Sequence, residues 1–513
     1  MLNAIGRELP EHVDGYGRVI PFAGAFAARP TTSRHAPPVK TMLPGESKLV
    51  GDIGEALEKV GIRDGMTLSF HHHLRNGDGV VNAVLHAASE MGAKDLKVAS
   101  SSVFPVHAPM VEHFESGVVT ALDTDYLSGP VAEAVSRGAL ARPIVLRTHG
   151  GRARAIECGQ LKIDVAFIAA PTADDYGNVN GVGGPTACGS LGYAFPDAEY
   201  ADRVVAVTDT LVDYPLAPVS IPQTRVDYVV EAQEIGDPEG IVSGITRITG
   251  DPVKLGIAQT AAEVVRAAGL LRDGFSYQTG AGGTSLAVTR FARRMMEEAG
   301  VVGSFALGGI TGPLVEMLRD GLFRRLIDVQ GFDLEATRSI AADPNHLEVG
   351  AGFYANAFNS GCAVNRLDCV ILGATQVDTD FNTNVVTGSD GTIMGGSGGH
   401  SDAAAGAKLT IVVASLVRGN LPIVTDEVLT ATTPGESVDV VVTDRGVAVN
   451  PRRSDLEGRL MAAGLPVTDI SGLRKAAEKA AGTPRPAEVG DKIVAVVEYR
   501  DGTLIDVVRQ VAI

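Results

Sequence analysis

An internal repeat is the feature that most constrains the fold of this chain. Residues 164–180 (DVAFIAAPTADDYGNVN) match residues 368–384 (DCVILGATQVDTDFNTN), with Asp, Ala, Asp, Asn and Asn retained in the same places. A shorter pair, RDGMT at 63–67 and RDGFS at 272–276, precedes each copy. These separations are far longer than solenoid periods. The repeat predicts two related domains in tandem; two unrelated domains that share similar strand–turn segments are the alternative.

Short apolar runs that alternate with amphipathic helical patterns predict an α/β protein. Runs such as LKVASSS, PIVLRTH and RVVAVTDTLV have the pattern of buried strands in a parallel or mixed sheet. At 513 residues the chain is too long for one core. We expect an extended, Pro-rich arm over residues 1–45, a first domain over 46–240 and a second over 241–513.

Charge and composition exclude several classes of function. The formal net charge is −17, tryptophan is absent and only 5% of residues are aromatic. These values disfavour nucleic-acid and anionic-membrane partners. The four cysteines form no CxxC pair, which favours reduced thiols over a disulfide framework or a zinc site. We find no signal peptide and no membrane-length apolar run, so a cytoplasmic protein is expected.

A glycine-rich loop is the first candidate for chemistry. Gly395, Gly396, Gly398 and Gly399 fall within five positions, and Asp402 follows. Glycine is used this densely where backbone adopts positive φ or approaches a ligand closely. Such a loop can direct several amide N–H groups at one oxyanion or phosphate. A solvent-exposed flexible loop is the alternative.

Two further segments offer binding groups. In FHHHLRNGD, the side chains of His71 and His73 are predicted on one face and that of His72 on the other; with Arg75 they suit an anion. Structural histidines are the alternative, and no metal is expected because no acidic or Cys ligand set has the usual spacing. A strand–helix turn contains glycines that can present helix N–H groups to a phosphate: Gly280, Gly282, Gly283 and Thr284. A dinucleotide-binding turn is the rival, but GxGxxG is incomplete.

Several motifs together resemble a known family. LGATQVDTDFNTN followed by GGSGGHSD is similar to the β-type half of family I coenzyme A transferases, and the first half resembles their α-type half. GMTLSFHHHLRNGDGVVN and the arm segment VIPFAGAFAARP resemble the family of bacterial citrate lyase alpha subunits over essentially the full chain. The resemblance implies two tandem, internally related open-sheet domains of the NagB/RpiA type.

The resemblance also implies an activity. Members exchange acetate for citrate on the CoA-like prosthetic group (phosphoribosyl-dephospho-CoA) of an acyl carrier, for which CoA is a mimic. The citryl thioester is then cleaved by a lyase subunit in citrate fermentation. Expected partners are therefore the carrier (gamma) and citryl-lyase (beta) subunits, with the chain a homo-oligomer within the complex and no cofactor attached to it. The glycine loop would act as catalyst, and His71, His73, Arg75 and Asn382 would bind substrate.

One departure leaves the mechanism open. Many family I transferases carry a nucleophilic Glu after a strand, but FALGGI at 305–310 contains none. The nearest carboxylate, Glu316, resembles the nucleophile of the acetyl-CoA hydrolase branch, and it equally fits a helix-surface residue paired with Arg319. A stand-alone acetyl-CoA transferase or hydrolase that uses Glu316 is therefore the alternative function. A non-catalytic module on the same fold is a third reading.

Overall fold

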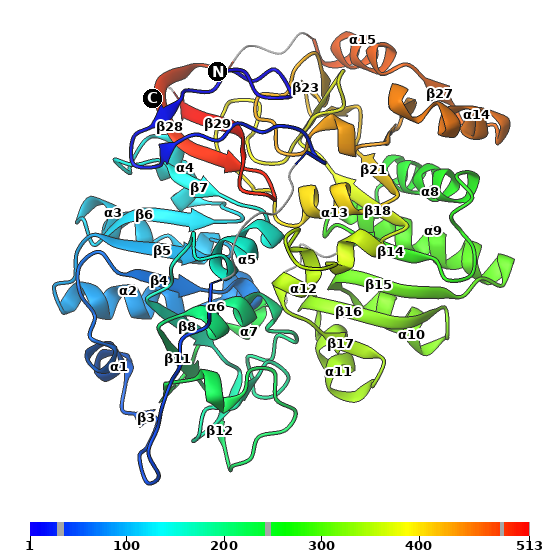
Figure 1. Ribbon diagram of the computed structural model, residues 1–513. Helices are drawn as coiled ribbons and strands as arrows, with labels where there is room; N and C mark the ends of the chain where they lie inside the picture. The colour runs from blue at the N-terminus through cyan, green and yellow to red at the C-terminus, as the bar shows by residue number, and fades with distance from the viewer. Residues whose placement is uncertain (28–34, 242–247, 483–486, 512–513) are drawn as a thin grey trace.

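The computed structural model describes residues 1–27, 35–241, 248–482 and 487–511. Two halves lie side by side, each built on a large sheet with helices packed against it (Figure 1). The shorter helices α5, α12 and α13 lie between the two sheets. The predicted α/β class is thereby confirmed.

The first sheet has ten strands, of which all but the hairpin β28–β29 pair in parallel. Every residue of its strand β8 is buried, as expected for a strand covered on both faces. In spatial order the strands are β29 (Leu504–Val511), β28 (Val489–Glu498), β7 (Ile144–Leu146), β6 (Val119–Thr124), β5 (Leu96–Ser100), β4 (Thr67–Phe70), β8 (Val165–Ala169), β11 (Arg203–Thr208), β13 (Tyr228–Glu231) and β3 (Leu49–Val50).

Seven α-helices of the described chain belong to this half. The first begins at an Asp52 cap, whose carboxylate accepts the N–H of Glu55 at 2.8 Å, and ends at Gly61 in the left-handed region. The helices are α1 (Ile53–Val60), α2 (Val80–Glu90), α3 (Met110–Glu115), α4 (Pro130–Ser136), α5 (His149–Glu157), α6 (Phe195–Tyr200) and α7 (Pro238–Ile241).

The second sheet has nine strands and is parallel except at the β25–β26 hairpin. Its spatial order is β17 (His346–Glu348), β16 (Phe323–Gly331), β15 (Gly303–Ile310), β14 (Ser276–Thr279), β18 (Cys369–Gly373), β21 (Leu409–Val413), β25 (Val440–Thr443), β26 (Gly446–Val449) and β27 (Val467–Thr468). Its helices are α8 (Pro252–Ala267), α9 (Gly283–Ala299), α10 (Gly312–Arg319), α11 (Leu334–Ala342), α12 (Ala351–Ala355), α13 (His400–Gly406), α14 (Ser454–Ala462) and α15 (Ile470–Ala481).

The two sheets share one strand order. The run β7-β6-β5-β4-β8-β11-β13 of the first corresponds to β17-β16-β15-β14-β18-β21-β25 of the second, and all neighbours in both runs are parallel. The repeated sequence segments fall on β8 and β18, at the same place in this order. The strand order therefore agrees with the internal repeat.

Equivalent hydrogen bonds repeat in the two small sheets that follow β8 and β18. The Asp174 carboxylate accepts from the backbone N–H of Asn178 at 2.9 Å and from its side-chain amide at 2.7 Å. Asp378 and Asn382 make the same pair of bonds at 2.8 and 3.1 Å. These turns join β9 (Thr172–Asp174) to β10 (Val179–Asn180) and β19 (Gln376–Asp378) to β20 (Thr383–Asn384), with β12 (Leu211–Val212) and β24 (Val424–Thr425) beside them.

Both ends of the chain pack on the first half. In Figure 1 the blue N-terminal segment lies beside the red strands β28 and β29, and the backbone N–H of Phe22 donates to the carbonyl oxygen of Leu504 at 2.9 Å. Strand β28 pairs with β7. The last strands therefore complete the first sheet, although the boundaries predicted from sequence assigned them to the second domain. That division of the chain stays a prediction.

The short remaining pairs are β1 (His12–Val13) with β2 (Gly17–Arg18), and β22 (Val417–Arg418) with β23 (Leu421–Pro422). None of the helices in the described part of the chain combines the length and the apolar character needed to cross a bilayer.

The segment that leaves the first half packs tightly on the turn after β4. The backbone N–H of Asp237 donates to the carbonyl oxygen of Gly77 at 2.7 Å, and a Cβ on Gly77 would lie 2.2 Å from the Asp237 carbonyl oxygen. We expect Gly77→Ala to lower the free energy of unfolding by about 1–3 kcal/mol. The added Cβ would clash with a backbone carbonyl, which cannot move aside as a flexible side chain can. Urea denaturation followed by circular dichroism measures it.

Gly256→Ala is the matched control, since Gly256 lies in α8 with no atom within 4 Å of its added Cβ. It should raise stability by about 0.5–1 kcal/mol through the helix preference of alanine. Equal effects of the two substitutions would contradict the packing argument.

Candidate active site

The glycine loop 395–399 lies at the junction between the two halves. The Gly398 amide N–H donates to the carbonyl oxygen of Asp125 at 3.1 Å, and the Gly398 carbonyl accepts from the His149 amide at 2.8 Å. Gly398 has a φ of +50°, in the left-handed region that favours glycine. The loop of the second half is thus bound to the carboxyl ends of β6 and β7 of the first.

The other glycines of the loop are required by close packing. A Cβ on Gly396 would lie 2.1 Å from the Asp125 carbonyl oxygen, and one on Gly399 would lie 2.4 Å from the Tyr354 hydroxyl. The Gly398 amide is engaged by Asp125, whereas among the described residues the amides of Gly395, Gly396 and Gly399 donate to no protein acceptor. Those three amides, rather than all four, fit the predicted role as oxyanion donors.

Asp402 holds the loop against the first half. Its carboxylate accepts from the Thr148 hydroxyl at 2.9 Å and from the Gly150 amide at 2.8 Å, and it lies 3.7 Å from Nε of Arg500. Asp402 is fully buried, and burial raises the pKa of its carboxyl against the opposing effect of Arg500. Partners from two separate segments of the chain, residues 148–150 and Arg500, therefore converge on one carboxylate.

Beside the loop, four side chains form what we call the junction cluster: His72, Asp125, His149 and Tyr193. Nδ1 of His149 lies 2.9 Å from Oδ2 of Asp125, and its ring centroid is 5.3 Å from that of His72 and 4.3 Å from that of Tyr193. Nε2 of His72 bonds Oε1 of Gln330, from the second half, at 2.9 Å. Burial lowers the pKa of His149 to about 4 and raises that of Asp125 well above its usual range.

Sequence reasoning did not single out Asp125, His149 or Tyr193. The available signal was position: Asp125 follows β6 and His149 follows β7, at the carboxyl ends of parallel strands where ligands commonly bind. His72 was assigned to the opposite face from His71 and His73, and it is the one that reaches the junction.

The structure does not bring His71 and His73 to the glycine loop. Nε2 of His71 lies 3.2 Å from Asp197, which also receives two hydrogen bonds from Arg152. Nε2 of His73 lies 2.6 Å from the carbonyl oxygen of Ala169. The two rings stack at 6.1 Å and both residues are buried, so these histidines occupy the interior of the first half.

Arg75 spans the two halves. It is buried, has a φ of +53°, and donates from Nη2 to the carbonyl oxygen of Gly331 at 2.9 Å. Its guanidinium lies 4.4 Å from the centre of the Phe332 ring. Arg75 therefore contacts the second half at the end of β16, and its contact with substrate stays a prediction.

Two other predicted residues also have protein partners. The Asn382 side chain bonds Asp378 and accepts from the amide of Gly435 at 2.9 Å, so it supports the turn rather than the junction. Glu316 lies on α10 with 64% of its side chain exposed, 3.0 Å from Nη1 of Arg293. The exposed ion pair fits the helix-surface reading of Glu316, with Arg293 in place of the expected Arg319.

The second half has a cavity of about 640 Å³ at the carboxyl ends of its parallel strands. Gly282, Gly283 and Thr284 line it, and Gly280 lies just before them in the same turn. Its rim carries exposed cations, with lining residues that include Lys254, Arg418 and Arg445. The predicted phosphate-binding turn thus borders a pocket with cationic side chains.

This pocket is connected to the glycine loop through His400. Nε2 of His400 lies 2.9 Å from the carbonyl oxygen of Gly373, which lines the pocket, and His400 directly follows Gly399. Nδ1 of His400 lies 2.7 Å from the Thr433 hydroxyl. Burial lowers the pKa of His400 to about 4, so the ring is a neutral structural link between the two places.

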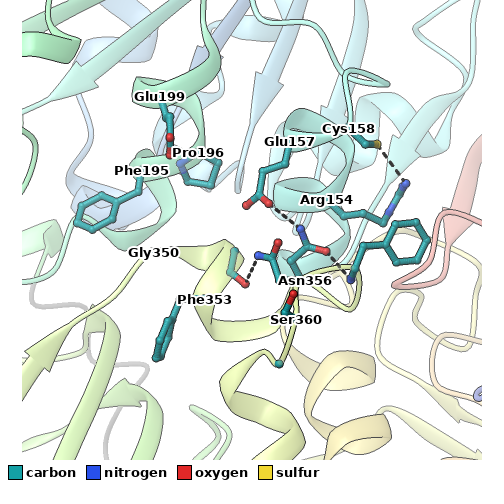
Figure 2. Close-up of a pocket in the computed structure, with 14 residues that line it drawn as sticks. Arg154, Glu157, Cys158, Phe195, Pro196, Glu199, Gly350, Phe353, Asn356 and Ser360 are labelled. Carbon is teal, nitrogen blue, oxygen red and sulfur yellow. Dashed lines mark hydrogen bonds between the residues drawn. The ribbon is translucent and has the colours of Figure 1, made fainter. Parts of the chain in front are cut away.

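A second cavity, of about 680 Å³, lies between the halves at the far end of α5 (Figure 2). Figure 2 shows Glu157 and Asn356 joined across it by a hydrogen bond of 2.9 Å, with Phe195 and Phe353 at its edge. Helix α5 runs from His149 in the junction cluster to Glu157 in this cavity. None of the residues predicted from sequence as catalytic, substrate-binding or cofactor-binding lines it.

The described ranges contain neither a cluster of metal ligands nor a disulfide bond. Within them, no group of three or more His, Cys, Asp or Glu side chains is placed to hold a metal ion. All four cysteines are free thiols.

Comparisons with known proteins agree on one family. A family model described as citrate lyase, alpha subunit, matches residues 46–511. The citrate lyase alpha chain of Escherichia coli (strain K12) is 50% identical over 466 residues, 91% of each chain. That of Klebsiella pneumoniae is 48% identical over 491 residues, 96% of each.

Solved structures extend the comparison. One assigned to the alpha subunit of citrate lyase from Streptococcus mutans, in complex with citrate, has a TM-score of 0.96 at 48% identity and covers 100% of both chains. A chain of a Pseudomonas malonate decarboxylase hetero-tetramer has a TM-score of 0.63 at 20% identity, covering 85% of this chain and 86% of its own, and shares the fold alone.

Two parallel-sheet halves that bind each other through a glycine loop define an α/β enzyme whose candidate site lies between them. The extent of the family match and the identity to curated relatives make the assignment specific. The chain belongs to the citrate lyase alpha subunit family.

The buried His73 generates a pH-dependent prediction. Burial, followed by the charge of His71, lowers the pKa of His73 to about 4, whereas an unfolded histidine titrates near 6.5. As the pH falls from about 6.5 to 4, the imidazole binds a proton in the unfolded state but not in the folded state. The free energy of unfolding therefore decreases by up to about 1.4 kcal/mol per pH unit. We expect His73→Gln to remove about 2 kcal/mol of the loss between pH 7 and pH 5.

Urea denaturation of wild type and variant at both pH values measures this difference. His86→Gln is the control, because the His86 side chain is 72% exposed and the substitution should leave the pH dependence unchanged. An unchanged pH dependence in the His73 variant would show that the folded protein leaves the pKa of this ring near its unfolded value.

Proposed function

We propose that this chain transfers the thiol of an acyl carrier's CoA-like prosthetic group from acetate to citrate. Acetyl thioester and citrate are converted into citryl thioester and free acetate, and a lyase partner cleaves the citryl thioester. The observation that carries the proposal is the glycine loop at the junction, where the amides of Gly395, Gly396 and Gly399 donate to no acceptor in the described part of the chain. Membership of the citrate lyase alpha subunit family supports the choice of citrate.

Direct exchange requires no nucleophile from the protein. A citrate carboxylate oxygen attacks the acetyl carbonyl, the C–S bond breaks, and a mixed anhydride and a thiolate are formed. The thiolate then attacks the citryl carbonyl of the anhydride, and acetate leaves. Each step passes through a tetrahedral oxyanion, and one well-placed amide donor lowers such a barrier by on the order of 3 kcal/mol.

The pocket beside the glycine loop suits the carrier's arm. Its turn at Gly282 and Gly283 opens the 17-residue helix α9, and Lys254 and Arg445 stand on its rim. Helix N-termini and cationic side chains both favour phosphate groups. The His400 contact to Gly373 joins this pocket to the loop, so an arm held there would extend its thioester toward the junction.

A covalent route through Glu316 is the competing mechanism. It requires the carboxylate to meet the thioester at the junction, whereas Glu316 is paired with Arg293 on an exposed helix. A glutamyl thioester would be trapped by hydroxylamine or borohydride, and direct exchange would be unaffected. We expect neither reagent to inactivate the chain in the presence of acetyl carrier.

Partners follow from the same proposal. The relatives are named as alpha chains of citrate lyase. An acyl carrier subunit and a citryl-lyase subunit are the partners that the exchange requires. The decisive assay mixes this chain with acetyl carrier, or with acetyl-CoA as its mimic, and labelled citrate. Release of acetate with formation of citryl thioester supports the proposal, and absence of both with an intact carrier refutes it.

The packing of Gly399 against Tyr354 generates a test of the loop. We expect Gly399→Ala to lower kcat for exchange by about 10²-fold or more, because its Cβ would meet the Tyr354 hydroxyl at 2.4 Å and displace the loop amides. Tyr354→Phe removes that oxygen and leaves the nearest ring carbon 3.3 Å away. The double variant should regain at least tenfold over the single one, measured as steady-state exchange.

A single variant as active as wild type would count against the loop assignment. A double variant no better than the single one would place the defect elsewhere than in this contact.

The cationic rim generates a second test. We expect Lys254→Glu and Arg445→Glu each to raise the KM for acetyl carrier by about 5–20-fold, because they turn attraction of phosphate into repulsion. The KM for citrate should stay within about twofold. Lys59→Glu, on the exposed helix α1, reverses a charge far from the pocket lining and should change neither constant. Equal effects of all three reversals would refute a phosphate site at this rim.

A further inference from the structure

The imidazole of His149 points one ring nitrogen at the glycine loop. A Cβ built on Gly398 would lie 3.3 Å from Nε2 of His149, closer than from any other atom. The backbone amide of His149 is itself bonded to the Gly398 carbonyl oxygen. His149 keeps 12% of its side chain exposed, whereas His72 beside it is 5% exposed and Asp125 1%. Nε2 is thus the part of the junction cluster best placed to meet a substrate.

The rest of the His149 side chain is fixed. Nδ1 is held by Asp125 at 2.9 Å, and the ring lies against His72 and Tyr193, with centroids 5.3 and 4.3 Å away. Nε2 has no hydrogen-bond partner among the residues that the structure describes. A ring oriented on three sides, with its fourth directed at a catalytic loop, has the preorganisation that transition-state stabilisation needs.

We propose that His149 is a catalytic residue that donates a hydrogen bond from Nε2 to the acyl oxygen in each exchange step. This inference rests on the exchange reaction proposed above. When the carboxylate or thiolate attacks, the carbonyl π electrons move to oxygen, and the Nε2–H group and a loop amide stabilise the charge. The oxyanion then collapses and expels thiolate or acetate. His149 keeps its proton throughout.

The buried surroundings of Asp125 support a proton on Nε2. Oδ1 of Asp125 is buried without a hydrogen-bond partner, which is costly for a carboxylate and less so for a carboxyl group. Burial and the charges of Asp123 and Asp197 raise the pKa of Asp125, while Arg152 and Arg147 oppose them. A protonated Asp125 donates to Nδ1, and the neutral ring then carries its proton on Nε2.

Two amide substitutions separate the roles of the ring nitrogens. In His149→Gln the side-chain amide reaches as far as Nε2 and can still donate at the loop. In His149→Asn the shorter amide can bond Asp125 but does not extend to the loop. We expect kcat for acetyl–citrate exchange to fall by about 10²–10³-fold in the Asn variant and by no more than about tenfold in the Gln variant. The KM values for citrate and carrier should stay within about threefold in both.

Equal losses of kcat in the two variants, or a loss carried by KM alone, would overturn the proposal. Thermal denaturation of both variants is run alongside, and the Gln variant keeps the test valid where the Asn variant unfolds. A wild-type chain with no exchange at all refutes the proposed function instead, so the two failures are distinguishable.

Whether Nε2 of His149 carries the ring proton can be measured directly, without an activity assay. ¹⁵N NMR of the full chain labelled at histidine distinguishes a protonated Nε2 from an unprotonated one, and His149→Gln identifies the signal. A protonated Nε2 at neutral pH supports the donor role. A signal from an unprotonated Nε2, with the proton on Nδ1, would overturn it whatever the activity of the variants.

Discussion

The buried carboxylate of Asp402 is the contact on which the candidate site depends. It accepts a hydroxyl and an amide hydrogen bond from the first half while its own backbone belongs to the second. Hydrogen bonds to charged groups contribute about 1.5–3 kcal/mol each, and a buried carboxylate without them is far more costly than one left in water. The halves must therefore meet at this point, and the glycine loop just before Asp402 is fixed as a consequence.

Similar strand order does not make the two halves equivalent. In the second half the ends of β14, β18, β21 and β25 surround an open pocket, with Gly282, Ala374, Ser415 and Asp444 among its lining residues. In the first half the turn after the matching strand β4 is covered by the segment that contains α7, through contacts of Gly77 and Gly79. One copy of the fold thus keeps a ligand-sized space where the other packs its own chain.

The sequence predicted what local patterns can encode. Apolar runs defined the sheets, the repeat anticipated the shared strand order, and glycine density marked the loop 395–399 as a candidate site. Alternation separated His72 from His71 and His73, but it cannot say which face meets the other half. Asp125, His149 and Tyr354 were missed because their importance comes from contacts with residues distant in the chain. From the sequence, Gly396 and Gly399 showed only that glycines are dense in this segment. The reason that each must be glycine, an atom too close for a Cβ, required the structure.

The geometry of the junction also explains why the loop presents backbone amides rather than side chains. With Gly396 against the Asp125 carbonyl and Gly399 against the Tyr354 hydroxyl, no volume remains for a Cβ on either residue. Charged side chains nearby are engaged elsewhere: Arg75 with Gly331, and Arg152 with Asp197. Under the exchange mechanism proposed above, the groups that meet the acyl oxygen are loop amides and the His149 imidazole. These neutral donors stabilise developing charge, and they bind the ground-state carboxylate less tightly than a cation would.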